Sequence, residues 1–272
     1  MRKSFDAQRT NENHLWPTPE NPFTLGLFAA IGRGKTSLLL YLMLNKDIYY
    51  GQFDRIILFS TVLELDKKME LLFGDPKICK SNQMLEDMKW FEQCEQANLN
   101  DIELPPRNIL PKYHPIAVED CHDVYDESIV KKLADHQKET IKTYGRDAAD
   151  RVLCVFEDAP ALGCFSGRTV HHDRLARFMT EIRHYKCSTI MVSQQFKIVP
   201  RVVRINLTAC FVARLSDKES EEIFEVFHGK LDRKRWFELY HEVTGKDYGF
   251  LQVNQLNNSG FMLIDNTDAF LG

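Results

Sequence analysis

The sequence contains no run of about 18 apolar residues, which is the length that a membrane-spanning helix needs. Its first residues, MRKSFDAQRTNENHLWP, are polar and lack the apolar segment of a secretory signal. We therefore expect a soluble protein that is not secreted and has no membrane segment.

Signals for disulfide pairing are also absent. The seven cysteines are an odd number, and no two of them form a CxxC pair. Small secreted domains that depend on disulfides show an even number of closely patterned cysteines. We exclude that class and expect free or buried thiols in a reducing compartment.

The sequence has no excess of positive charge and no base-reading motif. Lys and Arg number 35 against 39 Asp and Glu, so the formal net charge is −4. No internal repeat or low-complexity segment is present either. A sequence-specific regulator of nucleic acid is therefore disfavoured, and any contact with DNA requires locally clustered basic residues.

What the sequence does contain is a series of apolar segments that alternate with helical ones. Such a series is typical of a parallel sheet that helices cover on both faces. We expect strands at 23–28, 55–60, 152–156, 189–192 and 208–214, with two short ones at 247–253 and 259–264. We expect helices at 35–44, 127–144, 169–186 and 217–244, the last with Asp217 as its N-cap.

This pattern predicts one α/β domain over residues 22–272. Residues 1–21 read as a flexible N-terminal arm that ends among prolines. Residues 64–125 read as an insertion or an edge region of the sheet, and 216–272 as C-terminal helices and short strands. Ligands of such folds bind beyond the carboxyl ends of the strands.

A phosphate-binding loop is the first functional motif. Residues 29–37 read AAIGRGKTS, in which Gly34, Lys35 and Thr36 fill the last places of G-x-x-x-x-G-K-[ST] and Ala29 replaces the first Gly. A strand is expected before the loop and a helix after it, so backbone N–H groups face the phosphates. We expect Lys35 to reach the β- and γ-phosphates and Thr36 to ligate Mg²⁺. The predicted nucleotide-binding residues are Ala30, Ile31, Gly32, Arg33, Gly34, Lys35, Thr36 and Ser37.

Two carboxylates follow the apolar strand in RVLCVFEDAP, residues 151–160. Carboxylates at the tip of a buried strand are costly unless they serve a cation or act as a base. We assign Glu157 to Mg²⁺ and Asp158 to the attacking water, and the reverse assignment remains open. A third strand ends in Ser193 and Gln194, and we expect Gln194 to contact the γ-phosphate or the water.

These three elements, in this order and spacing, resemble the poxvirus-type DNA-packaging ATPases of the FtsK–HerA superfamily. The resemblance covers roughly residues 23–60 and 151–215. Its further motifs are an Arg-His pair, a Gln followed by an aromatic, a basic residue and Val-Pro, and an Arg four residues later. Here these are Arg183-His184, the segment from Gln194 to Pro200, and Arg204. Glu157 stands where the family has Asp.

The resemblance implies a P-loop NTPase fold of the RecA/FtsK type, a three-layer sandwich around a mainly parallel sheet. It implies a motor that uses ATP and Mg²⁺ to thread double-stranded viral DNA into a preformed capsid. Such motors work as rings, usually hexamers, and many are monomers until DNA or the capsid assembles them. A capsid or vertex protein would be the partner, and the host cytoplasm, the viral factory and the virion would be the locations.

Basic residues supply the other candidates. In such rings an arginine of one subunit completes the site of the next, and Arg183 and Arg204 are the candidates here, with Arg201 and Arg214 behind them. Two basic clusters are candidates for sequence-independent contact with DNA phosphates. They comprise Lys197, Arg201 and Arg204 in the first cluster, and Lys230, Arg233, Lys234 and Arg235 in the second.

Three other functions remain open at this point. The first is another FtsK/HerA-like DNA translocase or helicase-like motor that is unrelated to capsids. The second is a nucleotide-binding assembly protein that does not hydrolyse ATP, which Ala29 and Glu157 favour. The third is a kinase, for which no separate lid over an acceptor site is evident.

Overall fold

The computed structural model describes residues 22–45, 48–62, 69, 72, 88, 90–97, 99, 104, 116–165, 174–228, 232–254 and 261–264. The predicted N-terminal arm and most of the predicted insertion at 64–125 lie outside these residues. Within the described residues, no helix has the length and hydropathy that crossing a bilayer requires.

The described strands form one sheet in the order β3-β2-β4-β5-β1-β6-β7-β8. Every neighbouring pair from β3 to β6 is parallel, and β7 and β8 continue the sheet in antiparallel fashion. The strands are β1 (Thr24–Phe28), β2 (Arg55–Ser60), β3 (Cys121–His122), β4 (Val152–Glu157), β5 (Cys187–Ser193), β6 (Ala209–Val212), β7 (Phe250–Asn254) and β8 (Phe261–Ile264). The predicted α/β class with a mainly parallel sheet is confirmed.

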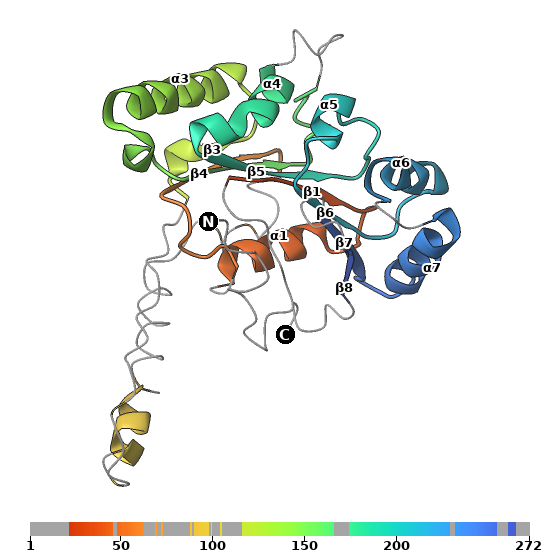
Figure 1. Ribbon diagram of the computed structural model, residues 1–272, viewed down its shortest axis with the longest axis horizontal. Helices are drawn as coiled ribbons and strands as arrows, with labels where there is room; N and C mark the ends of the chain where they lie inside the picture. Colours follow the sequence, from red (N-terminus) through yellow and green to blue (C-terminus); the bar gives the residue numbers. More distant parts are fainter. Residues whose placement is uncertain are drawn as a thin grey trace, which may run out of the picture.

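Helices cover both faces of the sheet (Figure 1). Helix α1 lies on one face, and α3, α4 and α5 lie on the other, with α6 and α7 beside the β6–β7 end. The helices are α1 (Lys35–Leu44), α3 (Glu127–Tyr144), α4 (Arg174–Glu181), α5 (Arg201–Arg204), α6 (Asp217–Phe227) and α7 (Arg233–Thr244). This is the three-layer arrangement that the sequence predicts.

Two apolar cores explain why the central strands are apolar throughout. On β4, Leu153 and Val155 join the core that contains α1, whereas Cys154 and Phe156 join the core on the opposite face. Successive side chains of a strand point to opposite faces, so a strand between two layers needs apolar residues at every position. Of the six described cysteines, all are free thiols and five are buried.

The structure differs from the predicted elements at two helices. The segment expected as one helix up to Lys186 contains α4 and then a 3-10 helix, η5 (Ile182–Tyr185). The helix expected over 217–244 is two helices, and Asp232 caps the second by accepting a hydrogen bond from the Arg235 N–H at 2.9 Å. Asp217 is not the N-cap of α6, because Ser216 occupies that position and Asp217 lies in the first turn.

Candidate nucleotide-binding site

The loop between β1 and α1 has the shape that a phosphate-binding loop needs. Gly32 and Gly34 have φ angles of 73° and 82°, in the left-handed region that favours glycine. The backbone N–H of Ala29 donates to Ser193 O at 3.3 Å, and that of Ala30 donates to Arg214 O at 3.2 Å. The loop is therefore fixed to the strands on both sides of β1.

Ala29 does not disturb this loop. It is fully buried at the end of β1, and it is absent from the described residues with positive φ. A position with ordinary φ accepts a Cβ atom without backbone strain. The first Gly of the motif is therefore not required by the backbone of this loop.

Lys35 is the first residue of α1, and its side chain reaches back to the loop. Its Nζ donates to Ala29 O at 2.8 Å and to Ala30 O at 3.0 Å. Burial lowers the pKa of Lys35, while the nearby carboxylates of Asp158 and Glu157 act in the opposite direction. An ammonium group is thus held where the oxygen atoms of a phosphate would meet it.

Glu157 connects two other elements to this loop. Its Oε1 accepts a hydrogen bond from Thr36 Oγ1 at 3.0 Å, and its Oε2 accepts one from Ser60 Oγ at 2.6 Å. Ser60 is the register partner of Glu157 in the pairing of β2 with β4. Only 4% of Glu157 is exposed, so this carboxylate is buried between a helix start and two strand ends.

Thr36 and Glu157 fit a nucleotide-bound Mg²⁺. Adjacent oxygens of an octahedral Mg²⁺ site, each about 2.1 Å from the ion, lie about 3 Å apart, which matches these two side chains. The described residues contain no group of three or more His, Cys, Asp or Glu side chains that would hold a metal without help. Mg²⁺ ordinarily combines one or two protein oxygens with water and substrate phosphates.

Asp158 and Gln194 lie at the same edge of the sheet. Asp158 directly follows β4 and has a left-handed φ of 51°, and its carbonyl accepts hydrogen bonds from Ala161 N at 2.8 Å and Leu162 N at 3.2 Å. Gln194 directly follows β5, the strand between β4 and β1, and is half-buried. The fold therefore places both residues beside the phosphate loop, at the carboxyl ends of neighbouring strands.

Arg183 lies at the opposite edge. It belongs to η5, is exposed, and lines a hollow of about 360 Å³ together with Thr24 and Thr208. These two residues mark the amino ends of β1 and β6. A five-residue strand spans roughly 15 Å, so Arg183 is not brought to the phosphate loop of its own subunit.

Arg204 is engaged inside the subunit. Its Nη1 donates to Glu222 Oε2 at 2.8 Å, its guanidinium lies 5.1 Å from the centre of the Phe196 ring, and its side chain is 13% exposed. Arg214, by contrast, adjoins the loop through its backbone and has an exposed side chain.

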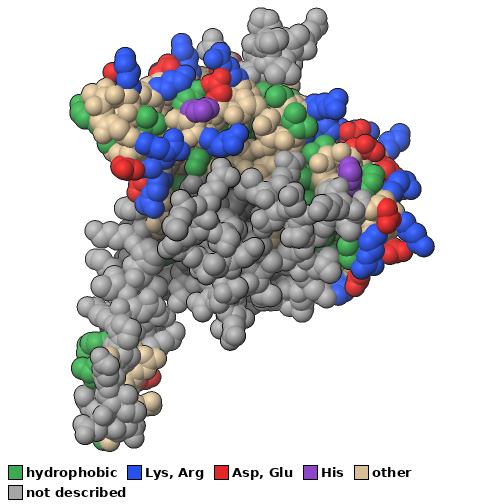
Figure 2. Space-filling model, in the orientation of Figure 1, with side chains coloured by type: hydrophobic (Ala, Val, Ile, Leu, Met, Phe, Trp, Pro, Cys, Tyr) green, Lys and Arg blue, Asp and Glu red, His purple; other side chains and the backbone are tan. Residues whose placement is uncertain are grey.

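Among the predicted DNA-binding residues, several pair with an acidic side chain. Lys197 lies 3.3 Å from Glu222, Arg233 pairs with Glu221, and Arg235 lies 3.2 Å from Glu238. Arg201 and Lys234 are exposed, and Lys230 lies outside the described residues. On the face in Figure 2, basic and acidic side chains are mixed in the region of α6 and α7.

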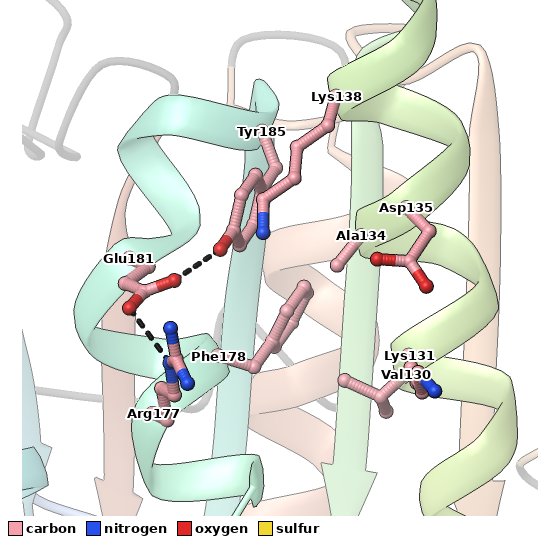
Figure 3. A pocket seen from close by; sticks show the side chains of 9 residues that line it. All are labelled: Val130, Lys131, Ala134, Asp135, Lys138, Arg177, Phe178, Glu181 and Tyr185. Carbon is pink, nitrogen blue, oxygen red and sulfur yellow. Dashed lines mark hydrogen bonds and ion pairs between the residues drawn. The ribbon is translucent and has the colours of Figure 1, made fainter.

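A hollow of about 310 Å³ lies between α3 and α4 and is not part of this site. Figure 3 shows its lining, in which Glu181 accepts hydrogen bonds from Arg177 and Tyr185, and Lys138 lies over the Tyr185 ring. Burial and the Glu181 carboxylate raise the pKa of Tyr185. None of the predicted site residues lines it.

Sequence reasoning missed three residues that contact this site. Ser60 holds Glu157, Asp247 lies 3.3 Å from Arg33, and the Tyr248 ring contacts Gly34. The position of Ser60 at the end of a strand was a usable signal. Nothing local marked the other two.

The described fold is shared with solved structures of the genome packaging NTPase B204 from Sulfolobus turreted icosahedral virus 2. Its sulfate complex has a TM-score of 0.53 and 13% identity, over 91% of this chain and 100% of that one. Its AMP complex has a TM-score of 0.52 and 11% identity, over 92% and 99%. Its ATP-gammaS complex has a TM-score of 0.51 and 14% identity, over 89% and 96%.

At identities of 11–14% this likeness establishes the fold, which is that of a P-loop NTPase. No family model matches the chain, and no curated protein matches it significantly.

Proposed function

We propose that the protein is a Mg²⁺-dependent ATPase that moves double-stranded viral DNA into a preformed capsid. The observation that carries the ATPase part is the buried Glu157 carboxylate hydrogen-bonded to Thr36 beside Lys35. The packaging part is supported by the sequence motifs and by the fold shared with a viral genome packaging NTPase, which has been solved with ATP-gammaS.

Each residue of the site has a distinct task in this proposal. Lys35 leaves the carbonyls of Ala29 and Ala30 and binds the β- and γ-phosphates. Thr36 and Glu157 hold Mg²⁺, which when bound neutralises phosphate charge. Asp158 accepts the proton of the attacking water, because its carboxylate lies at the strand end next to Glu157. Gln194, between them and the loop, orients that water against the γ-phosphate.

The position of Arg183 supports a ring of subunits. Arg183 lies at the amino edge of the sheet, away from the phosphate loop of its own subunit, and it is exposed. A neighbouring subunit could therefore receive it. An arginine supplied by a neighbour stabilises the charge of the transition state and raises the rate by about 10³–10⁵. We therefore propose a homo-oligomeric ring, hexameric as in the family it resembles, that assembles on DNA and on a capsid or vertex protein in the host cytoplasm or viral factory.

Two alternatives differ from this proposal in measurable ways. A DNA translocase or helicase-like motor unrelated to capsids would hydrolyse ATP but would not bind empty capsids. A non-hydrolysing assembly protein would bind ATP tightly without turnover. The ordinary φ of Ala29 and the placement of Glu157 favour hydrolysis over the second alternative.

The test is ATP hydrolysis with Mg²⁺, measured with and without double-stranded DNA of random sequence. Lys35→Ala is the loss-of-function variant, and Lys218→Ala, an exposed lysine on α6, is the matched control. We expect turnover that rises with DNA, disappears in Lys35→Ala and persists in Lys218→Ala. Tight ATP binding without turnover, with DNA and empty capsids both present, would overturn the motor.

A further inference from the structure

A turn from the far end of the chain lies against the phosphate loop. Residues 245–249, here called the 245–249 turn, connect α7 to β7. Within it, Asp247 Oδ1 lies 3.3 Å from Arg33 Nη1, and a Cβ atom on Gly34 would lie 3.0 Å from Tyr248 Cδ1. β7 is antiparallel to β6, with Leu251 opposite Val212, so the turn lies at the carboxyl edge of the parallel strands.

The backbone of this turn is held in a costly shape. Tyr248 has a left-handed φ of 57°, which an aromatic residue rarely adopts. The next residue, Gly249, has no room for a side chain, since a Cβ there would lie 2.0 Å from Val243 O. Phe250 follows and is 1% exposed, which anchors the turn to the core. Backbone strain of this kind persists where the surroundings enforce it, and it concentrates at ligand sites.

This turn places a partly exposed aromatic ring, that of Tyr248, at the phosphate loop. Tyr248 is 37% exposed although its ring edge contacts Gly34. The Arg33–Asp247 pair is mostly exposed on the Asp247 side, at 91%, and an exposed pair is weak. The contacts with Gly34 and the buried Phe250 therefore fix the ring, and the ion pair only adds to them.

The order of the strands indicates which part of a nucleotide meets this ring. Glu157 lies on β4, on one side of β1, and the 245–249 turn lies beyond β6, on the other side. The terminal phosphate and Mg²⁺ belong beside Glu157. The α-phosphate and the nucleoside therefore leave the loop toward β6 and β7, where Tyr248 lies.

We propose that Tyr248 is the platform on which the base of a bound nucleoside triphosphate stacks. The inference rests on the proposed nucleotide-binding function and adds to it a residue that binds the nucleoside. An aromatic face binds any base, so this contact provides affinity for the nucleoside without reading its hydrogen-bonding edge.

The test measures separately how the base and the phosphates of the nucleotide contribute to binding. Calorimetry would measure the affinities of the full chain for ATP and for inorganic triphosphate, both with Mg²⁺. The variants are Tyr248→Asn, which accepts a left-handed backbone, and Tyr248→Phe, which keeps the ring. Tyr144→Asn, at an exposed tyrosine on α3, is the matched control.

We expect Tyr248→Asn to weaken ATP binding by about 5- to 150-fold, the range for one base on one aromatic ring. Its affinity for triphosphate should stay within about two-fold, and Tyr248→Phe and Tyr144→Asn should resemble the wild type. Unchanged ATP affinity in Tyr248→Asn, or equal weakening of both ligands, overturns this inference alone. A wild type that binds neither ligand overturns the proposed function as well.

Discussion

Thr36 donates a 3.0 Å hydrogen bond to Glu157, although 121 positions separate them in the chain. This hydrogen bond between side chains joins the first turn of α1 to the last residue of β4. Because the Glu157 carboxylate is buried, the hydroxyl groups of Thr36 and Ser60 help to set its orientation.

The Ser60 hydroxyl is predicted to set that orientation. Ser60→Ala removes the 2.6 Å hydrogen bond to Oε2 of Glu157. One hydrogen bond is worth about 1 kcal/mol, so the kcat for ATP should fall about three- to tenfold, with a higher Mg²⁺ requirement. Ser220→Ala, at a buried serine on α6 that bonds to Asp217 O, is the control. An unchanged kcat and Mg²⁺ dependence in Ser60→Ala would contradict this role.

Arg204 and Arg183 should differ in how much their substitution changes the free energy of unfolding and the rate of ATP hydrolysis. Arg204→Ala removes the ion pair with Glu222 and the contact with the Phe196 ring, so we expect the free energy of unfolding to fall by about 1–2 kcal/mol. Arg183→Ala alters an exposed side chain, and its effect should stay within about 0.5 kcal/mol. Urea unfolding of both variants measures these changes.

The activity of Arg183→Ala is then informative. We expect hydrolysis by assembled rings to be lost, and to return when Arg183→Ala subunits are mixed with Lys35→Ala subunits, since each supplies the part that the other lacks. Mixtures that stay inactive would speak against a shared site.

We predict that a basic residue already in an ion pair contributes less to DNA binding than an exposed one. Arg201 and Lys234 are exposed, whereas Arg235 already faces Glu238. Arg201→Ala and Lys234→Ala should each weaken binding of random-sequence duplex and lower the slope of log affinity against log salt by about 0.9. Arg235→Ala should lower it less. Equal slopes in all variants would place the DNA elsewhere.

Acid should weaken the contact between the starts of β2 and β4. Hydrogen bonds from Arg151 lower the pKa of Asp54 to about 2. An unfolded chain protonates this carboxyl near pH 4, so the stabilisation is complete above about pH 4 and is lost as the pH falls toward 2. The Asp54 side chain is 41% exposed, which limits the effect to below about 1 kcal/mol.

The matching variant is Asp54→Asn, with Asp123→Asn as an exposed control. Urea unfolding at pH 5 and at pH 3 should show a smaller loss of stability in Asp54→Asn than in the wild type. The control should lose as much as the wild type does. If Asp54→Asn loses as much stability as the wild type, other carboxyl groups cause the loss.

Local patterns predicted most of the fold. The bounds of α1, β2 and α3 match the expected ranges 35–44, 55–60 and 127–144, because apolar content and the lengths of the segments are properties of the segments themselves. The break between α6 and α7 was missed, and so was the cap, since Ser216 and Asp217 are both residues that cap helices well.

The candidate site was predictable only where a motif is continuous in sequence. Lys35 and Thr36 belong to one motif, and Glu157 and Asp158 lie at the end of one strand, so their common edge follows from a parallel sheet. Ser60 reaches Glu157 through strand register, and Tyr248 reaches Gly34 through an antiparallel strand at the end of the chain. The strand-end position of Ser60 is visible in nearby sequence, but the partners that Ser60 and Tyr248 contact are not.

Lys35 has a further consequence for how binding is measured. Its ammonium group already has two oxygen partners, the carbonyls of Ala29 and Ala30. An ammonium group has three N–H donors, so binding both the β- and the γ-phosphate requires it to leave at least one of these carbonyls, which then needs another donor. The affinity observed for a nucleotide is therefore the difference between two sets of hydrogen bonds around one charge. Nucleotide binding at this loop exchanges hydrogen bonds to carbonyls for hydrogen bonds to phosphate. A substitution of Lys35 removes both kinds.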